Sequence, residues 1–154
     1  MESRTAIATE DAPAPAHTYS QGVRVGHFIQ VSGQGPVDPH TNEYLHPGDI
    51  SKQTIRALQN VEAVLKATGA SFDNVIMLRV YLARREDFSL MNDAYGEFLE
   101  SRLVGGVLPS RTTVVVDLPR DDTTALPQTA DAFSVTIRTV SSTTWRKPPC
   151  TRKR

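Results

Sequence analysis

One stretch of the sequence constrains the fold more than any other: an amphipathic helical pattern followed closely by an apolar run of strand length. Apolar residues recur at helical spacing through residues 50–67, where Asp49 is placed to cap the helix start and Gly69 to end it. Residues 75–82 (VIMLRVYL) are apolar and enriched in Val and Ile, which predicts a central strand. A helix beside such a strand indicates helices layered on a sheet.

Similar patterns on either side complete the predicted architecture. A second helix is predicted at residues 88–101, and a turn near Gly26 joins the first two strands into a hairpin. Gly33, Gly35 and Pro36 predict an abrupt end to the second strand, because such residues interrupt a ladder. The predicted strands are 22–26, 27–31, 75–82, 111–118 and 132–140. The order β-β-α-β-α-β-β predicts an α+β fold, with a single layer of two helices on one face of a mixed β-sheet.

The 154 residues fit one domain with an extension at each end. Residues 1–16 are rich in Ala and Pro and are expected to form an extended N-terminal arm, residues 17–140 the domain, and residues 141–154 a basic, disordered tail. The net charge is zero, but the tail holds five basic residues and no acid, so residues 1–144 carry 12 basic and 17 acidic residues. An acidic domain attracts phosphate backbones weakly, and nucleic acid is therefore not an expected partner.

The sequence carries no recognised signature for a cofactor, a metal ion or a disulfide framework. It lacks the patterns GxxxxGK[ST], GxGxxG, HExxH and GxSxG. The four histidines have no metal-ligand spacing, and Cys150 is the only cysteine. No segment has the roughly 18 consecutive apolar residues of a membrane span, and the N-terminus has no secretory apolar core. We therefore expect a cytoplasmic protein, and the sequence offers no metal site.

A set of polar residues at the predicted strand ends carries the functional signal. Tyr19 precedes the first strand, and Ser32 and Gly33 follow the second. Asn92 lies on the second predicted helix, and Arg111 opens the fourth strand directly after a Pro-Ser pair. The planar fork of an arginine suits bidentate binding of a carboxylate. Alternatively, this arginine satisfies the last carbonyls of a helix or a surface carboxylate.

Four segments of the chain, in this order, resemble the markers of a known family. They are Thr18-Tyr-Ser-Gln-Gly22, Phe28-Ile-Gln-Val-Ser-Gly-Gln34, Asn92-Asp-Ala-Tyr95 and Pro109-Ser-Arg-Thr-Thr-Val114. The family they resemble is the RidA (YjgF) family. The resemblance runs from about residue 6 to residue 119, over two-thirds of the chain, and agrees with the predicted helices and strands.

The resemblance implies a RidA/chorismate-mutase-like fold that assembles as a homotrimer, with three clefts between subunits. The predicted strands at 75–82 and 111–118 are apolar on both faces, which independently favours oligomerisation. Many family members hydrolyse reactive imines or enamines, notably 2-imino acids, to a keto acid and ammonia without a cofactor. The implied partner of this chain is a small imine or enamine substrate that bears a carboxylate.

The resemblance also implies roles for individual residues. Arg111 would clamp the substrate carboxylate, and Tyr19 and Ser32 would line the cleft. Gly33 would offer backbone groups, and Asn92 would support the site. An iminium carbon is already electrophilic, so positioning, desolvation and a directed water would supply most of the acceleration.

The sequence departs from the family pattern at His17-Thr18, where Gly-Pro usually precedes the tyrosine, and at two further places near the implied site. Thr113 stands where a small residue or a cysteine is common, and it keeps a small polar group without the thiol. Deaminating members carry a glutamate on the last strand that orients or activates the water, whereas this chain reads Ala130-Asp-Ala-Phe-Ser134. Either Asp131 replaces that glutamate as a catalytic residue, or the register places Ser134 there and leaves no carboxylate.

Several functions remain open at this point. The leading hypothesis is a RidA-type imine/enamine deaminase. The departures at Thr113 and on the last strand favour, as an alternative, a diverged member that catalyses tautomerisation or cyclisation of an imine or enamine in a specialised biosynthetic pathway. A third class is a non-catalytic ligand-binding or chaperone-like trimer. Some relatives are described as ribonucleases, and this hypothesis ranks last because the domain is acidic.

Overall fold

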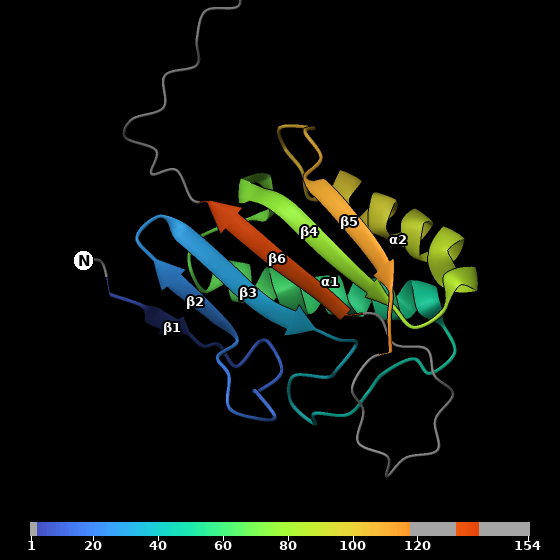
Figure 1. Cartoon of the computed structure of the whole chain (residues 1–154), viewed down its shortest axis with the longest axis horizontal. Helices are drawn as coiled ribbons and strands as arrows, with labels where there is room; N and C mark the ends of the chain where they lie inside the picture. Colours follow the sequence, from blue (N-terminus) through green and yellow to red (C-terminus); the bar gives the residue numbers. More distant parts are fainter. Residues whose placement is uncertain (1–2, 118–131, 139–154) are drawn as a thin grey trace, which may run out of the picture.

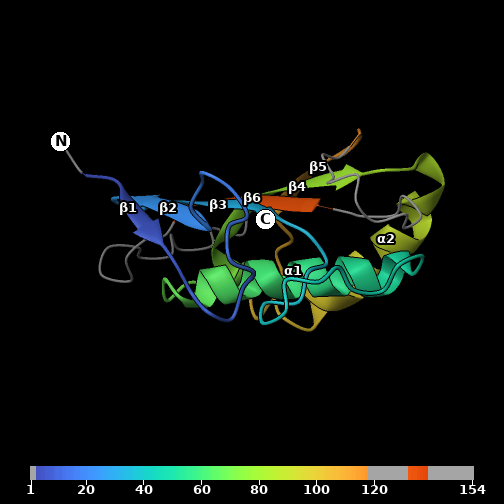
Figure 2. The same ribbon diagram turned by 90° about the horizontal axis from the view of Figure 1, so that it is seen from below.

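One β-sheet with both helices on the same face forms the described part of the protein (Figure 1, Figure 2). The computed structural model describes residues 3–117 and the backbone of residues 132–138, so Asp131 and the predicted tail 141–154 lie outside the described residues. The elements are β1 (Thr5–Ile7), β2 (Gly22–Val25), β3 (Phe28–Gln34), α1 (Ile50–Lys66), β4 (Val75–Leu82), α2 (Phe88–Glu100), β5 (Ser110–Val115) and β6 (Ala132–Arg138), with single 3₁₀ turns at Phe72–Asn74 and Arg85–Asp87. The predicted α+β architecture is confirmed.

The strand order explains how the helices come to lie together. The strands follow the order β1-β2-β3-β6-β4-β5, and all neighbours are antiparallel except β4 and β5, which are parallel. Parallel neighbours need a crossover connection, and α2 provides it. Figure 2 shows α1 and α2 side by side beneath the sheet. Because β5 is the last strand in this order, its helix-facing residues lie next to α2.

The N-terminal arm contains a strand that the sequence did not predict. β1 pairs antiparallel with β2, with Thr5 opposite Arg24 and Ile7 opposite Gly22. Ile7 is only 7% exposed and belongs to the hydrophobic core. A strand of three residues is too short for its alternation to be recognised in a sequence. The part of the arm that forms β1 is therefore held to the sheet.

The hairpin turn at Gly26 is confirmed, with a φ of +54° at that residue, but the second predicted strand is longer than expected. The glycines predicted that the strand stops at residue 31, whereas β3 continues to Gln34. A shift in the β3–β6 register between Val31 and Gln34 accommodates the intervening residues. Such a bulge lets a strand continue past a glycine that would otherwise interrupt the ladder.

Both predicted ends of α1 are confirmed. The side chain of Asp49 accepts a hydrogen bond from the backbone N–H of Lys52 at 3.0 Å, as an N-cap does. At the other end Gly69 has a φ of +76°, and the N–H of Ala70 donates to the carbonyl of Leu65 at 3.1 Å. This 6→1 bond is the signature of a Schellman motif, which a glycine makes easy.

The two faces of the sheet differ in burial. On β4, Leu78, Val80 and Leu82 face the helices and are fully buried. The helices of the same chain therefore bury these apolar residues of β4, and no partner subunit is needed to cover them. The other face is less covered, since Phe28 of β3 is 54% exposed and Val114 of β5 is 39% exposed. None of the described helices is long and apolar enough to cross a membrane.

Candidate active site

Arg111 lies on the helix-facing side of β5, at the seam between the sheet and α2. It is paired in register with the buried Leu78 of β4, and its own side chain is partly buried. The guanidinium carbon lies 4.7 Å from the ring centroid of Tyr95 and 5.9 Å from that of Phe88. Within residues 3–117 no carboxylate forms an ion pair with Arg111. The arginine therefore carries a charge that the described protein does not neutralise.

Local hydrogen bonds fix the backbone that delivers Arg111. The hydroxyl of Ser110 donates to the carbonyl of Ile76 at 2.6 Å, which ties the start of β5 to β4. Upstream, Asp73 Oδ1 accepts the backbone N–H groups of Val104 and Gly105 at 3.0 and 3.2 Å. These contacts hold both ends of the loop between α2 and β5.

Two buried hydroxyls belong to the same seam. Thr113 lies two residues after Arg111 on β5, and Tyr95 lies on α2 with a side chain that is only 6% exposed. Neither hydroxyl has a hydrogen-bond partner within the described residues. Burial raises the pKa of Tyr95 above its usual value of 10.0, and the charge of Arg111 partly opposes this shift. The tyrosine therefore stays neutral at physiological pH.

Three of the predicted site residues thus share this seam. Arg111 and Thr113 lie on β5, and the partly buried Asn92 lies on α2, three residues before Tyr95. The sequence analysis missed Tyr95 and Phe88 as neighbours of the arginine. The pattern at residues 88–101 predicted only a helix, although Tyr95 ends one of the quoted segments. We call these five residues the Arg111 half-site.

The other predicted residues gather at the far end of β3. The hydroxyl of Ser32 donates to the carbonyl of Ser20 at 2.6 Å, and its backbone N–H donates to the carbonyl of Gln21 at 2.9 Å. Tyr19 is 50% exposed, and a Cβ added to Gly33 would meet no atom within 4 Å. We call Tyr19, Ser32 and Gly33 the Tyr19 half-site. Its backbone and one tyrosine ring are open to a ligand.

The structure does not bring the two half-sites together in one chain. Strands β6 and β4 lie between β3 and β5, so the strands that carry the two half-sites are about 14 Å apart across three inter-strand spacings. A small substrate cannot span this distance. Asp131 lies outside the described residues, whereas Ser134 is placed on β6 opposite Arg79 of β4. The catalytic role of Asp131 therefore stays a prediction.

Other features of the described chain do not mark a competing site. No group of three or more His, Cys, Asp or Glu side chains among the described residues could hold a metal ion. A hollow of about 560 Å³ lies between the N-terminal arm and the loop at Pro39 and His40. Gln21, the buried polar residue in its wall, uses its amide to bind the arm itself. The hollow follows from how the arm folds back.

Comparisons with known proteins agree with this geometry. A family model described as Endoribonuclease L-PSP matches residues 9–124. A RutC family protein of Saccharolobus solfataricus is 47% identical over 116 residues, which is 75% of this chain and 87% of that protein. The 2-iminobutanoate/2-iminopropanoate deaminase of Escherichia coli is 37% identical over 116 residues, 75% of this chain and 88% of the enzyme. The crystal structure of Escherichia coli TdcF with bound serine superposes with a TM-score of 0.77 at 30% identity, covering 88% of this chain and 99% of that chain.

The matched segment contains every described residue of both half-sites, and the fold matches that of the superposed TdcF structure. The resemblance carried by the four sequence segments is thereby confirmed. The chain belongs to the RidA (YjgF) family.

Proposed function

We propose that this protein hydrolyses reactive 2-imino acids, and the enamines that tautomerise to them, to a keto acid and ammonia. The observation that carries the proposal is Arg111, a partly buried guanidinium with no carboxylate partner in residues 3–117. Such a group binds a substrate carboxylate bidentately. Two relatives support this chemistry: an Escherichia coli relative is a 2-iminobutanoate/2-iminopropanoate deaminase, and TdcF binds serine, which also carries a carboxylate.

The proposed reaction needs little covalent chemistry from the protein. Arg111 holds the carboxylate, so the adjacent C=N carbon is presented at a fixed position. A water molecule adds to that carbon, and ammonia then leaves with the keto acid as the second product. Asp131 is proposed to orient the water, and Tyr19 to line the face of the cleft opposite the arginine. An enamine must first gain a proton at carbon, which requires a general acid.

We further propose that the cleft lies between subunits of a cytoplasmic homotrimer. The separation of about 14 Å between the strands that carry the half-sites supports this arrangement, because a neighbouring subunit can supply the half that one chain cannot. The partly exposed face of the sheet, with Phe28 and Val114, offers an apolar surface for the assembly.

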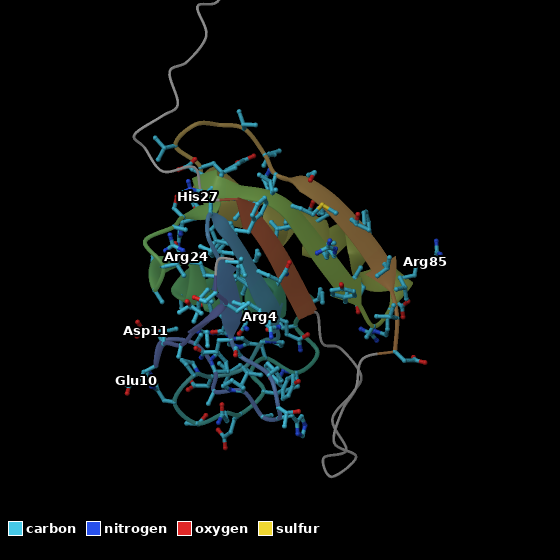
Figure 3. The ribbon with its side chains drawn as sticks, turned by 60° about the vertical axis from the view of Figure 1, so that its left-hand side comes forward. Arg4, Glu10, Asp11, Arg24, His27 and Arg85 are labelled. Carbon is cyan, nitrogen blue, oxygen red and sulfur yellow. The ribbon has the colours of Figure 1, made fainter. Side chains whose placement is uncertain are left out.

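The decisive experiment generates a 2-imino acid in situ with an amino-acid oxidase and follows release of the keto acid. Arg111→Ala removes the partner of a buried substrate charge, which costs roughly 2–5 kcal/mol and predicts about a 30-fold or larger loss in kcat/KM. The matched control is Arg85→Ala, since Arg85 is an exposed arginine near the β5 edge of the sheet that has no part in either half-site (Figure 3). Wild-type protein no faster than buffer would exclude the deaminase. Equal rates for wild type and Arg111→Ala would exclude the assigned site.

The same assay tests the water-directing carboxylate. Asp131→Asn is expected to lower kcat by about 100-fold, the usual contribution of a positioned acid or base, and to leave KM little changed. An unchanged kcat would remove Asp131 from the mechanism. Wild type that releases no keto acid would instead favour the second candidate, a diverged member that tautomerises or cyclises an imine or enamine and needs no activated water. Thr113, in place of the common small residue or cysteine, is the residue of the described site that favours this candidate.

A ribonuclease activity, which the description of the family model suggests, has less support. Figure 3 shows Arg24 and His27 at the β1–β2 end of the sheet, with Glu10 and Asp11 close to the same end. Acidic and basic side chains are therefore mixed where a phosphate backbone would need a continuous basic surface.

A further inference from the structure

The guanidinium of Arg111 lies between two aromatic rings of one helix. Phe88 and Tyr95 are seven residues apart on α2, so they occupy the same side of the helix about 10.5 Å from each other along its axis. The guanidinium carbon is 5.9 Å from one ring centroid and 4.7 Å from the other. A cation placed between the two rings along this side of the helix has such distances. We call Phe88 and Tyr95 the aromatic bracket.

The two rings of the aromatic bracket contribute unequally. Tyr95 is 6% exposed and belongs to the hydrophobic core, so its ring is fixed by packing and its contact with the cation is shielded from water. Phe88 is 44% exposed and lies farther from the cation. Cation–π attraction is stronger where it is desolvated. Tyr95 is therefore expected to be the main contact, and Phe88 an outer boundary.

The aromatic bracket has a consequence for ligand binding. An arginine side chain has many rotamers, and a free one would have to be ordered when a ligand binds. The rings of Phe88 and Tyr95 lie against the guanidinium of Arg111, so the side chain is ordered before a ligand binds. Because both rings lie close to the guanidinium carbon, a ligand is expected to approach the N–H donors at the edge that faces away from the rings. A planar carboxylate is the anion that matches such an edge bidentately.

We propose that Tyr95, with Phe88 as the outer ring, is the positioning residue of the Arg111 clamp and acts only through its ring. The inference rests on the proposed function for the class of substrate, a 2-imino acid or the corresponding keto acid. It makes Tyr95 a residue that sets carboxylate affinity without touching the reacting atoms.

The hydroxyl of Tyr95 provides a matched control. It is buried without a hydrogen-bond partner in the described residues, and burial raises its pKa. The hydroxyl therefore forms no hydrogen bond with the described part of the half-site and adds no negative charge to it. Tyr95→Phe keeps the ring and removes only this group. Tyr95→Leu removes the ring and keeps an apolar side chain. Comparing the two variants separates the ring from the hydroxyl.

The test measures binding of a stable keto acid, 2-oxobutanoate, to the intact protein by calorimetry, so it does not depend on turnover. Tyr95→Leu is expected to weaken binding by about 3- to 30-fold, the range of a cation–π contact, and Tyr95→Phe by less than about twofold. Phe88→Leu, at an exposed position that does not threaten folding, is expected to weaken binding by about two- to fivefold.

A double-mutant cycle distinguishes positioning from a general loss of structure. In the Arg111→Ala background, Tyr95→Leu is expected to cause no further loss, because the ring acts through the absent guanidinium. The same loss in both backgrounds, or binding of Tyr95→Leu and Phe88→Leu as tight as wild type, overturns the inference. Wild type that binds the keto acid with this pattern but releases none from imino acids overturns the proposed function alone.

Discussion

At the residue scale, a few buried side-chain amides connect segments that are distant in the sequence. Asn60 lies inside α1 and is fully buried, a position where asparagine is a poor helix former. Its Nδ2 donates to the carbonyls of Gly35 and Val37 at 3.0 and 2.8 Å, and its Oδ1 accepts from Arg56 Nε at 3.2 Å. These bonds hold residues 35–37, the segment that directly follows β3 and therefore lies next to Ser32 and Gly33 of the Tyr19 half-site.

Replacing Asn60 should therefore destabilise the protein more than its size suggests. Asn60→Ala leaves two backbone carbonyls without their donor, and we expect the free energy of unfolding to fall by about 1–3 kcal/mol. Urea unfolding measures this change. Gln59→Ala, at the adjacent and partly exposed position of α1, is the control and should change the value by less than about 0.5 kcal/mol. Equal effects of the two substitutions would contradict this role for Asn60.

A second prediction at this scale concerns pH. Hydrogen bonds from the side chain and then the backbone N–H of Lys52 hold the pKa of Asp49 below its usual 3.8. Because the folded value is the lower one, the charged cap stabilises the folded state fully above pH 3.8, and this stability is lost as the pH falls through the folded pKa. Asp49→Asn keeps a capping side chain that does not titrate.

The measurement is thermal unfolding of wild type and Asp49→Asn from neutral pH to well below 3.8. Wild type is expected to be the more stable near neutral pH, and its advantage is expected to shrink below that value. A difference that stays constant with pH would show that the carboxylate charge contributes nothing to the cap.

At the scale of elements, local patterns were predictable from sequence and long-range contacts were not. The limits of α1 follow from Asp49 and Gly69, because caps are built from neighbouring residues. β1 escaped prediction because it depends on β2 and on Gln21, twelve residues away from Thr9. The Tyr95–Arg111 contact escaped for the same reason, since the two residues meet only when α2 packs on β5.

Gln21 illustrates how one side chain can secure an element. Its Nε2 donates to the carbonyls of Thr9, Ala12 and Pro13 at 2.9–3.0 Å, and its Oε1 accepts the N–H of Thr9 at 2.7 Å. Gln21→Leu removes every one of these bonds. We expect faster amide hydrogen exchange at Thr9 and in β1, measured by mass spectrometry, with α1 unchanged. Exchange of the arm as slow as in wild type would mean that β1 pairing alone holds it.

At the scale of the whole molecule, one chain presents two halves of a site and a sheet covered on one face only. The strands that carry the half-sites lie about 14 Å apart across β6 and β4, while Phe28 remains 54% exposed on the other face of the sheet. Both facts have the same explanation if three chains associate through that face, because association buries the apolar surface and juxtaposes unlike halves. A sizing column should then give about three times the 16.9 kDa of one chain.

Mixed trimers test the shared cleft directly. Arg111→Ala damages one half-site and Tyr19→Ala the other, so each variant alone is expected to lose most of its activity. When the two are unfolded together and refolded in equal amounts, a cleft is intact if one subunit supplies Arg111 and its neighbour supplies Tyr19. Random assembly gives this combination in about a quarter of clefts, and about a quarter of wild-type activity should return.

The control mixes the two variants after separate refolding, and this mixture should regain no activity until subunits exchange. A site contained within one chain cannot be restored in this way, so activity no higher than that of the separate variants would place both halves in the same subunit.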